Sequence, residues 1–176
     1  VRLARTRTQG SAYYDVNPSG RVPYLVRPGS PSLEESSLIC AYLDRLGSGA
    51  RIVWPPDTSD WEYGRLETLA RAYLDGLAVL TRELRRPRNE QSPGIVAHET
   101  ARAARLANLW EQEIGNALMW GELNMAQLTL FCALDQAARL DDCKPFDGRP
   151  GLAAWTQRLA ERPSIVATRP DVPIAE

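Results

Sequence analysis

The chain has 176 residues, with 21 Lys and Arg against 22 Asp and Glu and a formal net charge of -1. This near-neutral balance argues against a protein that binds nucleic acid through phosphate contacts, which requires a strongly basic face. The 44% hydrophobic content is typical of a globular protein, and no apolar stretch reaches the roughly 18 residues of a membrane-spanning helix. We therefore expect a globular protein with neither nucleic acid nor a membrane as partner.

The three cysteines, Cys40, Cys132 and Cys143, have neither the spacing of a metal site nor the even count of a disulfide framework. Cys40 and Cys132 fall inside predicted helices, where buried structural cysteines are common, so neither is proposed as catalytic. This usage predicts a cytoplasmic protein without a bound metal.

The first third of the chain mixes strand and helix patterns. Residues 1–7 alternate like a short strand, and the NPSG run at 17–20 is a strong turn signal. The runs 22–26 and 32–35 flank a Pro/Gly turn, which predicts a hairpin. A helix then opens at Ser36 and ends before two glycines, with apolar positions at helical spacing: Leu38, Ile39, Tyr42, Leu43 and Leu46.

Trp54-Pro55-Pro56 is the best boundary in the sequence, because two prolines end any regular element. We place the domain border there, giving residues 1–54 and 55–176. Everything beyond it has a helical pattern. The predicted helices carry these apolar or core-facing positions: Leu66, Leu69, Ala70, Tyr73, Leu77, Leu80 and Leu84; Ile95, Glu99, Ala103, Leu106, Trp110 and Ile114; and Leu152, Trp155 and Leu159.

The helix that begins after Asn124 is apolar nearly all round, so it must be enclosed by other helices. Asn124 and Gln127 have the spacing of a capping box, in which the Asn side chain accepts from the backbone and the Gln side chain reaches back.

Most catalytic signatures are missing from the sequence. The single histidine, His98, has no partner at a useful spacing and is expected to be solvated. There is no GxSxG elbow, Walker motif or GxGxxG, and the carboxylates are scattered. Hydrolase, nucleotide and metal chemistry are therefore disfavoured.

Residues 17–25, NPSGRVPYL, followed by Glu35 and Ser36 at a helix start, have two interpretations. Pro23 is either an ordinary trans turn proline or a cis proline that presents the Val22 backbone for pairing with an extended, peptide-like ligand. Ser36 is either a plain N-cap or part of a site for a carboxylate, with Glu35 beside it able to hold an ammonium group.

Four segments resemble the cytosolic glutathione S-transferases of bacterial type. Residues 17–25 resemble the family's NPxG(K/R)VPxL segment, and 33–43, LEESSLICAYL, are similar to its LxESxAIxxYL element. The helix start at 124–127 resembles the (S/T)xxD capping motif, and 150–164 resemble the closing PxLxxWxxxxxxRPS segment. Gln127 stands where the family has Asp. Leu38 stands where it usually has Ala and is expected to face the sheet.

The resemblance implies an α/β plus all-α fold, in which a thioredoxin-like N-terminal domain, residues 1–54, is followed by an all-helical C-terminal domain, residues 55–176. Family members begin with a further strand and helix, whose connecting loop carries the Tyr, Ser or Cys that stabilises the glutathione thiolate. We therefore expect no catalytic residue within this sequence and place that group N-terminal to Val1. The resemblance also implies a homodimer.

The implied activity is attack of the glutathione thiolate on a small electrophile. Val22 would pair with the cysteinyl backbone of glutathione through a cis Pro23, Glu35 and Ser36 would hold the γ-glutamyl end, and Arg21 would meet a carboxylate near the glycyl end. The electrophile is expected against the helical domain. Its candidate positions are Tyr73 and Trp110. The alternatives are a non-catalytic binding or regulatory protein of the same fold and a glutathione-dependent isomerase.

Overall fold

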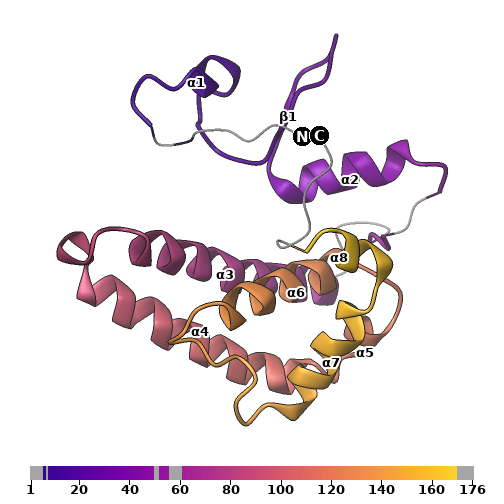
Figure 1. The fold of residues 1–176 in the computed structure, drawn as a ribbon. Coiled ribbons are helices and arrows are strands. Elements are labelled where there is room, and N and C mark those ends of the chain that lie inside the picture. The colour runs from indigo at the N-terminus through magenta and orange to yellow at the C-terminus, as the bar shows by residue number, and fades with distance from the viewer. Residues whose placement is uncertain (1–5, 7, 50–51, 56–60, 170–176) are drawn as a thin grey trace. The chain divides into compact units, whose positions relative to one another are not determined.

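The computed structural model describes residues 6, 8–49, 52–55 and 61–169 (Figure 1). The chain forms two compact units, Val1–Ile52 and Val53–Ile174. The border predicted at Pro55-Pro56 lies a few residues beyond this division, and Pro56 itself is outside the described residues.

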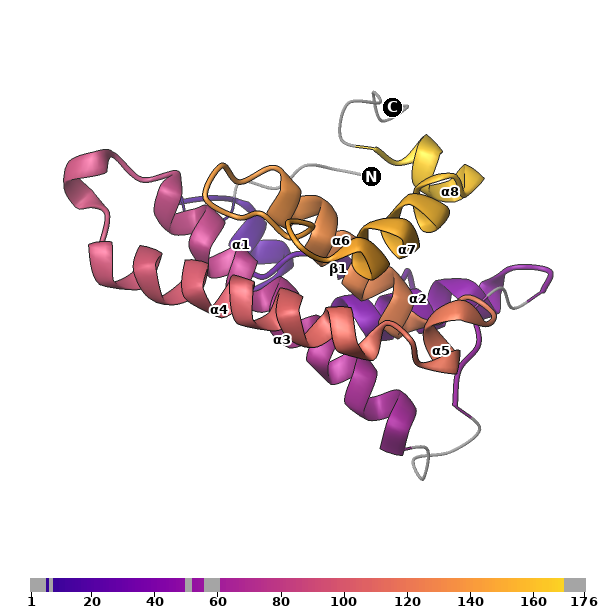
Figure 2. The same ribbon diagram turned by 90° about the horizontal axis from the view of Figure 1, so that it is seen from below.

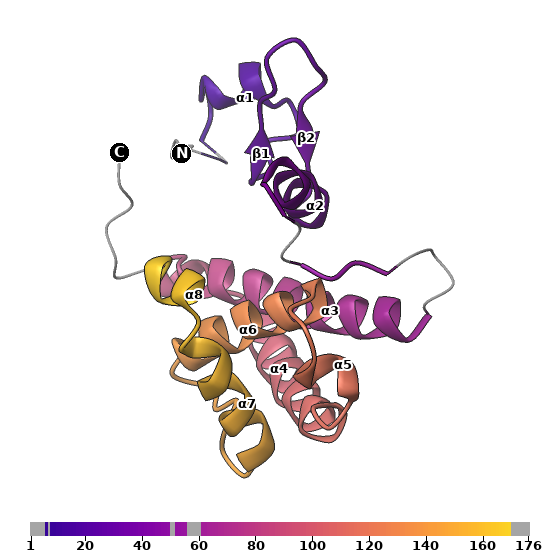
Figure 3. The ribbon, with the colours of Figure 1, turned by 90° about the vertical axis from the view of Figure 1, so that its right-hand side faces the viewer.

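The first unit contains a short helix, α1 (Tyr13–Val16), the strands β1 (Tyr24–Leu25) and β2 (Leu33–Glu34), and the helix α2 (Ser36–Leu46). The strands pair antiparallel, so the predicted hairpin is confirmed. In Figure 3 the two strands lie side by side, and α2 continues from β2. The strand predicted over residues 1–7 falls outside the described residues, except for Thr6, which is in a turn.

Helix α2 has the predicted bounds, but its apolar side chains are mostly exposed. Ile39 alone among them is buried in the described part of this unit, whereas Leu38, Leu43 and Leu46 are about half exposed or more. Whether Leu38 faces the sheet stays a prediction, and the described sheet leaves 52% of this side chain exposed. The described sheet has only two short strands, and α2 contacts β2, so it covers a small part of the helix surface.

The second unit is all-helical. Its elements are α3 (Trp61–Leu84), the 3-10 helix η1 (Arg88–Glu90), α4 (Pro93–Glu113), α5 (Ala117–Trp120), α6 (Met125–Ala138), α7 (Pro150–Ala160) and α8 (Pro163–Ala167). Figure 2 shows the long helices α3 and α4 running beside each other. Helix α3 contacts α4 and α6, and α7 contacts both α4 and α6, which closes a ring of four helices.

The core of this unit lies inside that ring. It is built from the apolar faces that the helical spacing predicted, and its largest fully buried side chains include Leu66, Tyr73, Trp110, Leu130, Leu152 and Trp155. Figure 3 shows α6 between α3 and α7, so the enclosure predicted from its composition is confirmed for most of the helix, although Cys132 is exposed. The burial of apolar surface is the main favourable contribution to folding, and it amounts to about 25 cal/mol per Å².

At the start of α6, the predicted cap by Asn124 is confirmed, whereas the predicted contact of the Gln127 side chain is wrong. Asn124 is the N-cap, and its Oδ1 accepts from the Gln127 N–H at 3.0 Å. The Gln127 side chain does not reach back to Asn124. Its Nε2 instead donates to the carbonyls of Leu118 and Glu122, at 2.7 and 3.0 Å, because the α5–α6 connection leaves these buried acceptors beside it.

The cysteines differ from expectation at one position. Cys143 is buried and Cys40 is half-buried, but Cys132 is exposed. Helix α6 buries Leu130, Ala133, Leu134 and Ala137, which leaves position 132 on the outer side. The prediction that Cys132 is buried is wrong because an apolar composition does not reveal which side of a helix lacks a neighbour.

Candidate functional site

Val22 lies immediately before β1 with its backbone available. The Val22–Pro23 peptide bond is cis, as the resemblance implies, and both residues are exposed. Neither the N–H nor the C=O of Val22 has a hydrogen-bond partner in the described part of the chain. An extended backbone with free donor and acceptor groups is what a peptide-like ligand needs to add itself as a further strand.

The loop before Val22 is organised by Asn17, which is buried. Its Nδ2 donates to the Arg21 carbonyl at 2.9 Å, and its Oδ1 accepts from the Ser19 N–H at 3.1 Å. The Tyr13 hydroxyl donates to the same Arg21 carbonyl. The residue before Val22 is therefore fixed from two directions. Asn17 was predicted as part of the turn at 17–20 and of the NPxG(K/R)VPxL segment, and the contact of Tyr13 was not predicted.

Glu35 and Ser36 lie at the N-terminus of α2, and their roles in the cap are exchanged relative to expectation. Glu35 is the N-cap, and its Oε2 accepts from the Ser37 N–H at 3.0 Å, whereas Ser36 is the first helical residue. The Ser36 hydroxyl donates to Glu35 Oε1 at 3.2 Å. The interpretation of Ser36 as the N-cap is therefore wrong.

The backbone of Glu35 has φ 81°, and it is the one non-glycine residue with positive φ among those the structure describes. Such a conformation costs on the order of 1–3 kcal/mol for a residue with a Cβ. It persists only where the surrounding structure imposes it, and residues of this kind cluster at functional sites.

The hairpin register brings these groups to one end of the sheet. Tyr24 pairs with Glu34 and Leu25 with Leu33, so Val22, just before β1, and the start of α2, just after β2, lie at the same end of the hairpin. Arg21 is mostly exposed, with its Nε 3.7 Å from Glu34 Oε1, and the Ser19 hydroxyl donates to the same carboxylate at 2.9 Å. All five residues predicted for the site thus lie in two adjacent segments, 21–23 and 35–36.

This arrangement combines three kinds of recognition. The Val22 backbone offers main-chain pairing, the start of α2 favours an anion through its N–H groups and dipole, and Glu35 provides a carboxylate for a cation. A ligand with a peptide backbone and an adjacent carboxylate and ammonium group would satisfy them together.

The aromatic positions predicted to lie near a second substrate are both buried. Trp110 is fully enclosed in the core, so it offers no surface to a ligand. Tyr73 is also buried, but it lines a pocket within the helical unit. His98, as expected, is largely solvated, with its side chain 68% exposed.

The described residues contain neither a metal-binding cluster nor a membrane-spanning helix. In residues 6, 8–49, 52–55 and 61–169, no group of three His, Cys, Asp or Glu side chains is arranged to hold a metal ion. No helix within these same ranges is long and apolar enough to cross a membrane.

Residues 1–46 match the family described as the glutathione S-transferase N-terminal domain. No curated protein matches the chain. Among solved structures, a glutathione transferase family member from Pseudomonas fluorescens Pf-5 with bound glutathione is 28% identical, with a TM-score of 0.79 over 93% of this chain and 79% of that one. The same family member with bound S-(propanoic acid)-glutathione gives a TM-score of 0.75 at 28% identity, over 90% of this chain and 81% of that one.

A glutathione S-transferase from Methylobacillus flagellatus KT with glutathione bound shares the fold, with a TM-score of 0.79 at 24% identity over 98% of this chain and 86% of that one. The match over residues 1–46 and this likeness in fold agree with the predicted thioredoxin-like domain followed by helices.

Proposed function

We propose that this chain, a member of the glutathione transferase family, binds glutathione at the end of its hairpin and conjugates the sulfur of glutathione to a small electrophile. We also propose that the protein is a cytoplasmic homodimer and that its activity requires no metal.

The observation that carries the proposal is the unpaired backbone of Val22 at the end of the hairpin where α2 starts. Glutathione is an extended tripeptide with a free amine and two carboxylates. In this proposal its cysteinyl backbone pairs with the Val22 N–H and C=O. Its γ-glutamyl carboxylate then replaces Glu35 as the acceptor of the Ser36 hydroxyl at the N-terminus of α2, and its ammonium group meets the Glu35 carboxylate.

Arg21 has the least fixed role. Its side chain is 70% exposed, and its Nε lies 3.7 Å from Glu34 Oε1. A surface ion pair of this kind contributes little free energy, so breaking it costs little. We propose that the guanidinium turns to the glycyl carboxylate when glutathione binds. Residues 1–55 carry 7 Arg against 4 acidic residues, a balance that favours an anionic tripeptide.

The chemical step balances as a substitution. The cysteinyl thiol loses its proton to solvent water, the thiolate sulfur forms a bond to carbon, and the carbon–halogen bond breaks so that a halide leaves with the bonding electron pair. We propose that the group that stabilises the thiolate lies N-terminal to Val1. Within this chain, the residues 21–23 and 35–36 bind and orient the tripeptide.

Titration calorimetry tests the binding step. We expect the full-length protein to bind glutathione with micromolar to millimolar affinity and Ser36→Ala to weaken binding about 10-fold, since hydrogen bonds to charged groups contribute roughly 1.5–3 kcal/mol. Ser30→Ala is the matched control, because Ser30 is exposed in the hairpin turn. The absence of any heat of binding to the intact protein would contradict the glutathione assignment.

An activated aryl halide tests catalysis separately. Formation of the glutathione conjugate above the uncatalysed rate supports a transferase, and binding without turnover supports a non-catalytic binding protein. Light scattering during gel filtration measures the mass and checks the dimer. A mass of one subunit at micromolar concentration would contradict that part of the proposal.

A further inference from the structure

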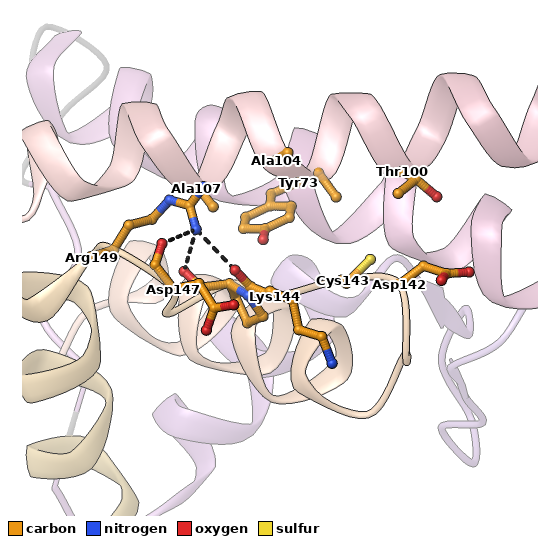
Figure 4. A pocket seen from close by; sticks show the side chains of 11 residues that line it. Tyr73, Thr100, Ala104, Ala107, Asp142, Cys143, Lys144, Asp147 and Arg149 are labelled. Carbon is orange, nitrogen blue, oxygen red and sulfur yellow. Dashed lines mark hydrogen bonds between the residues drawn. The ribbon is translucent and has the colours of Figure 1, made fainter.

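A pocket of about 190 Å³ opens within the helical unit, between α3, α4 and the loop 142–149 that joins α6 to α7. Figure 4 shows the side chains that line it. Helix α3 contributes Tyr73, and α4 contributes Thr100 and three alanines. The loop contributes Asp142, Cys143, Lys144, Pro145, Asp147 and Arg149.

The buried part of the lining is uncharged. Tyr73 is 1% exposed and Cys143 is 7% exposed, and Ala103, Ala107 and Pro145 beside them are buried as well. The charged residues Asp142, Lys144 and Asp147 are exposed at the rim. In Figure 4 the ammonium group of Lys144 and the carboxylate of Asp142 point away from Tyr73. A charged ligand would therefore find no buried partner of opposite sign.

Arg149 fixes the loop that forms one wall. Its Nη1 donates to the carbonyls of Lys144 and Asp147 at 2.9 and 3.0 Å, and its Nε donates to Asn108 Oδ1 on α4 at 2.9 Å. These bonds tie the loop to itself and to the helix. They also occupy the guanidinium, so Arg149 shapes the pocket rather than supplying a free cation to a ligand.

Two hydroxyl groups at the pocket lack partners. The Oγ1 of Thr100 is buried without a hydrogen bond. The Tyr73 hydroxyl, on a side chain that is almost wholly buried, has no hydrogen-bond partner among the described residues. In Figure 4 the Tyr73 ring projects into the pocket with its hydroxyl toward the loop. The Tyr73 hydroxyl is directed into the pocket rather than into packed side chains, so a molecule bound there can supply the hydrogen-bond partner that the chain does not.

Tyr73 is held as a neutral hydrogen-bond donor. Burial raises the pKa of its phenol far above the ordinary value, and the nearby Cys143 raises this pKa further, whereas Arg149 lowers it. Burial also raises the pKa of the Cys143 thiol. At neutral pH both groups are protonated, which keeps the floor of the pocket uncharged.

We propose that this pocket binds a small neutral alcohol or phenol, with its apolar body against Ala103, Ala107 and Pro145 and its oxygen hydrogen-bonded to the Tyr73 hydroxyl. A dry cavity of about 150 Å³ holds benzene, so a single substituted ring fits here and a drug-sized molecule does not. The site stands independently of the proposed glutathione binding.

Fluorine NMR of the full chain tests the site without glutathione present. The probe is 4-fluorophenol, and fluorobenzene is the matched compound without a hydroxyl. We expect 4-fluorophenol to bind with a dissociation constant of about 1 mM or below. Tyr73→Phe should weaken its binding about 5-fold while leaving the binding of fluorobenzene unchanged, because one hydrogen bond is lost at constant shape.

A second pair of variants locates the site. Ala104 lines the pocket on the exposed side of α4, so Ala104→Leu should fill it and abolish binding. Ala101→Leu is the control, since Ala101 is exposed on the same helix but does not line the pocket. The proposal is overturned if wild-type protein does not bind 4-fluorophenol, or if Tyr73→Phe and Ala104→Leu, shown by circular dichroism to be folded, bind it as wild type does.

Discussion

Glu35 takes part both in the local structure at the start of α2 and in the proposed binding of glutathione. Its backbone is held at φ 81°, a conformation that glycine adopts freely and that other residues adopt at a cost. Its carboxylate recovers part of that cost by capping α2 through the Ser37 N–H. A glycine would remove the backbone cost. The presence of a glutamate instead is explained if its carboxylate has a binding role.

Glu35→Gly tests this trade between stability and binding. We expect the free energy of unfolding, from urea denaturation, to stay equal or rise by about 1 kcal/mol, because the relieved backbone outweighs the lost cap. Glutathione affinity should fall at least 10-fold by calorimetry. Glu35→Gln is the control, since it keeps the backbone conformation and removes only the charge. A loss of more than about 1 kcal/mol for Glu35→Gly would show that the cap matters more than the backbone.

The residues proposed to bind glutathione could be selected from the sequence, but their supports could not. Val22, Glu35 and Ser36 were predicted because the motif and helix start are local in sequence. The contact between Tyr13 and the Arg21 carbonyl joins residues eight positions apart through a turn, and its existence depends on the path of the loop. The exchange of Glu35 and Ser36 at the cap depends on one φ angle, which residue identity does not determine.

Arg65 connects two helices, because its side chain links α3 to the end of α4. Its guanidinium bonds Glu113 through two nitrogens, at 2.8 and 2.7 Å, and Glu62 on its own helix at 2.9 and 2.7 Å. Asn116 donates to Glu62 at 2.7 Å, which extends the network into the α4–α5 connection. The hydrogen bond from Arg65 lowers the pKa of both carboxyl groups.

Arg65→Gln should lower the melting temperature at pH 7 by about 1–3 °C, because the network is partly exposed to solvent. A carboxyl group whose pKa is lowered on folding adds stability above its ordinary pKa of 4.5 and loses it as the pH falls through the lowered value. The difference in melting temperature between wild type and variant should therefore have its full size at pH 7 and become smaller below about pH 4. Thermal melts at both pH values measure it, and a difference independent of pH would contradict the ionic role.

Helices were the most predictable elements, because their periodicity repeats over many residues. The apolar spacing predicted α3, α4 and α7, and Ser92 caps α4 through the Ile95 N–H. The Gln127 side chain was misassigned for a different reason. Its acceptors, the carbonyls of Leu118 and Glu122, belong to a connection whose path the helical pattern does not specify.

Nearly all buried apolar side chains of the described residues belong to the helical unit. The helical unit has a continuous core that runs through α3, α4, α6 and α7. In the described part of residues 1–52, Ile39 is the sole buried apolar side chain. Local stability follows the density of buried contacts, so elements with few of them open more often than the core does. The segments proposed to bind glutathione therefore belong to the less stable part of the molecule.

Hydrogen exchange followed by mass spectrometry tests this difference directly. We expect the amides of Ser36–Leu46 to exchange at least about 100-fold faster than those of Met125–Ala138, because one helix buries a single side chain and the other buries eight. If glutathione binds at the start of α2, a concentration 100 times its dissociation constant should slow exchange in α2 by up to about 100-fold and leave α6 unchanged. Equal exchange rates in the two helices would mean that they open in one cooperative step. Slowing confined to α6 would place the ligand in the helical unit and contradict the site at Val22, Glu35 and Ser36.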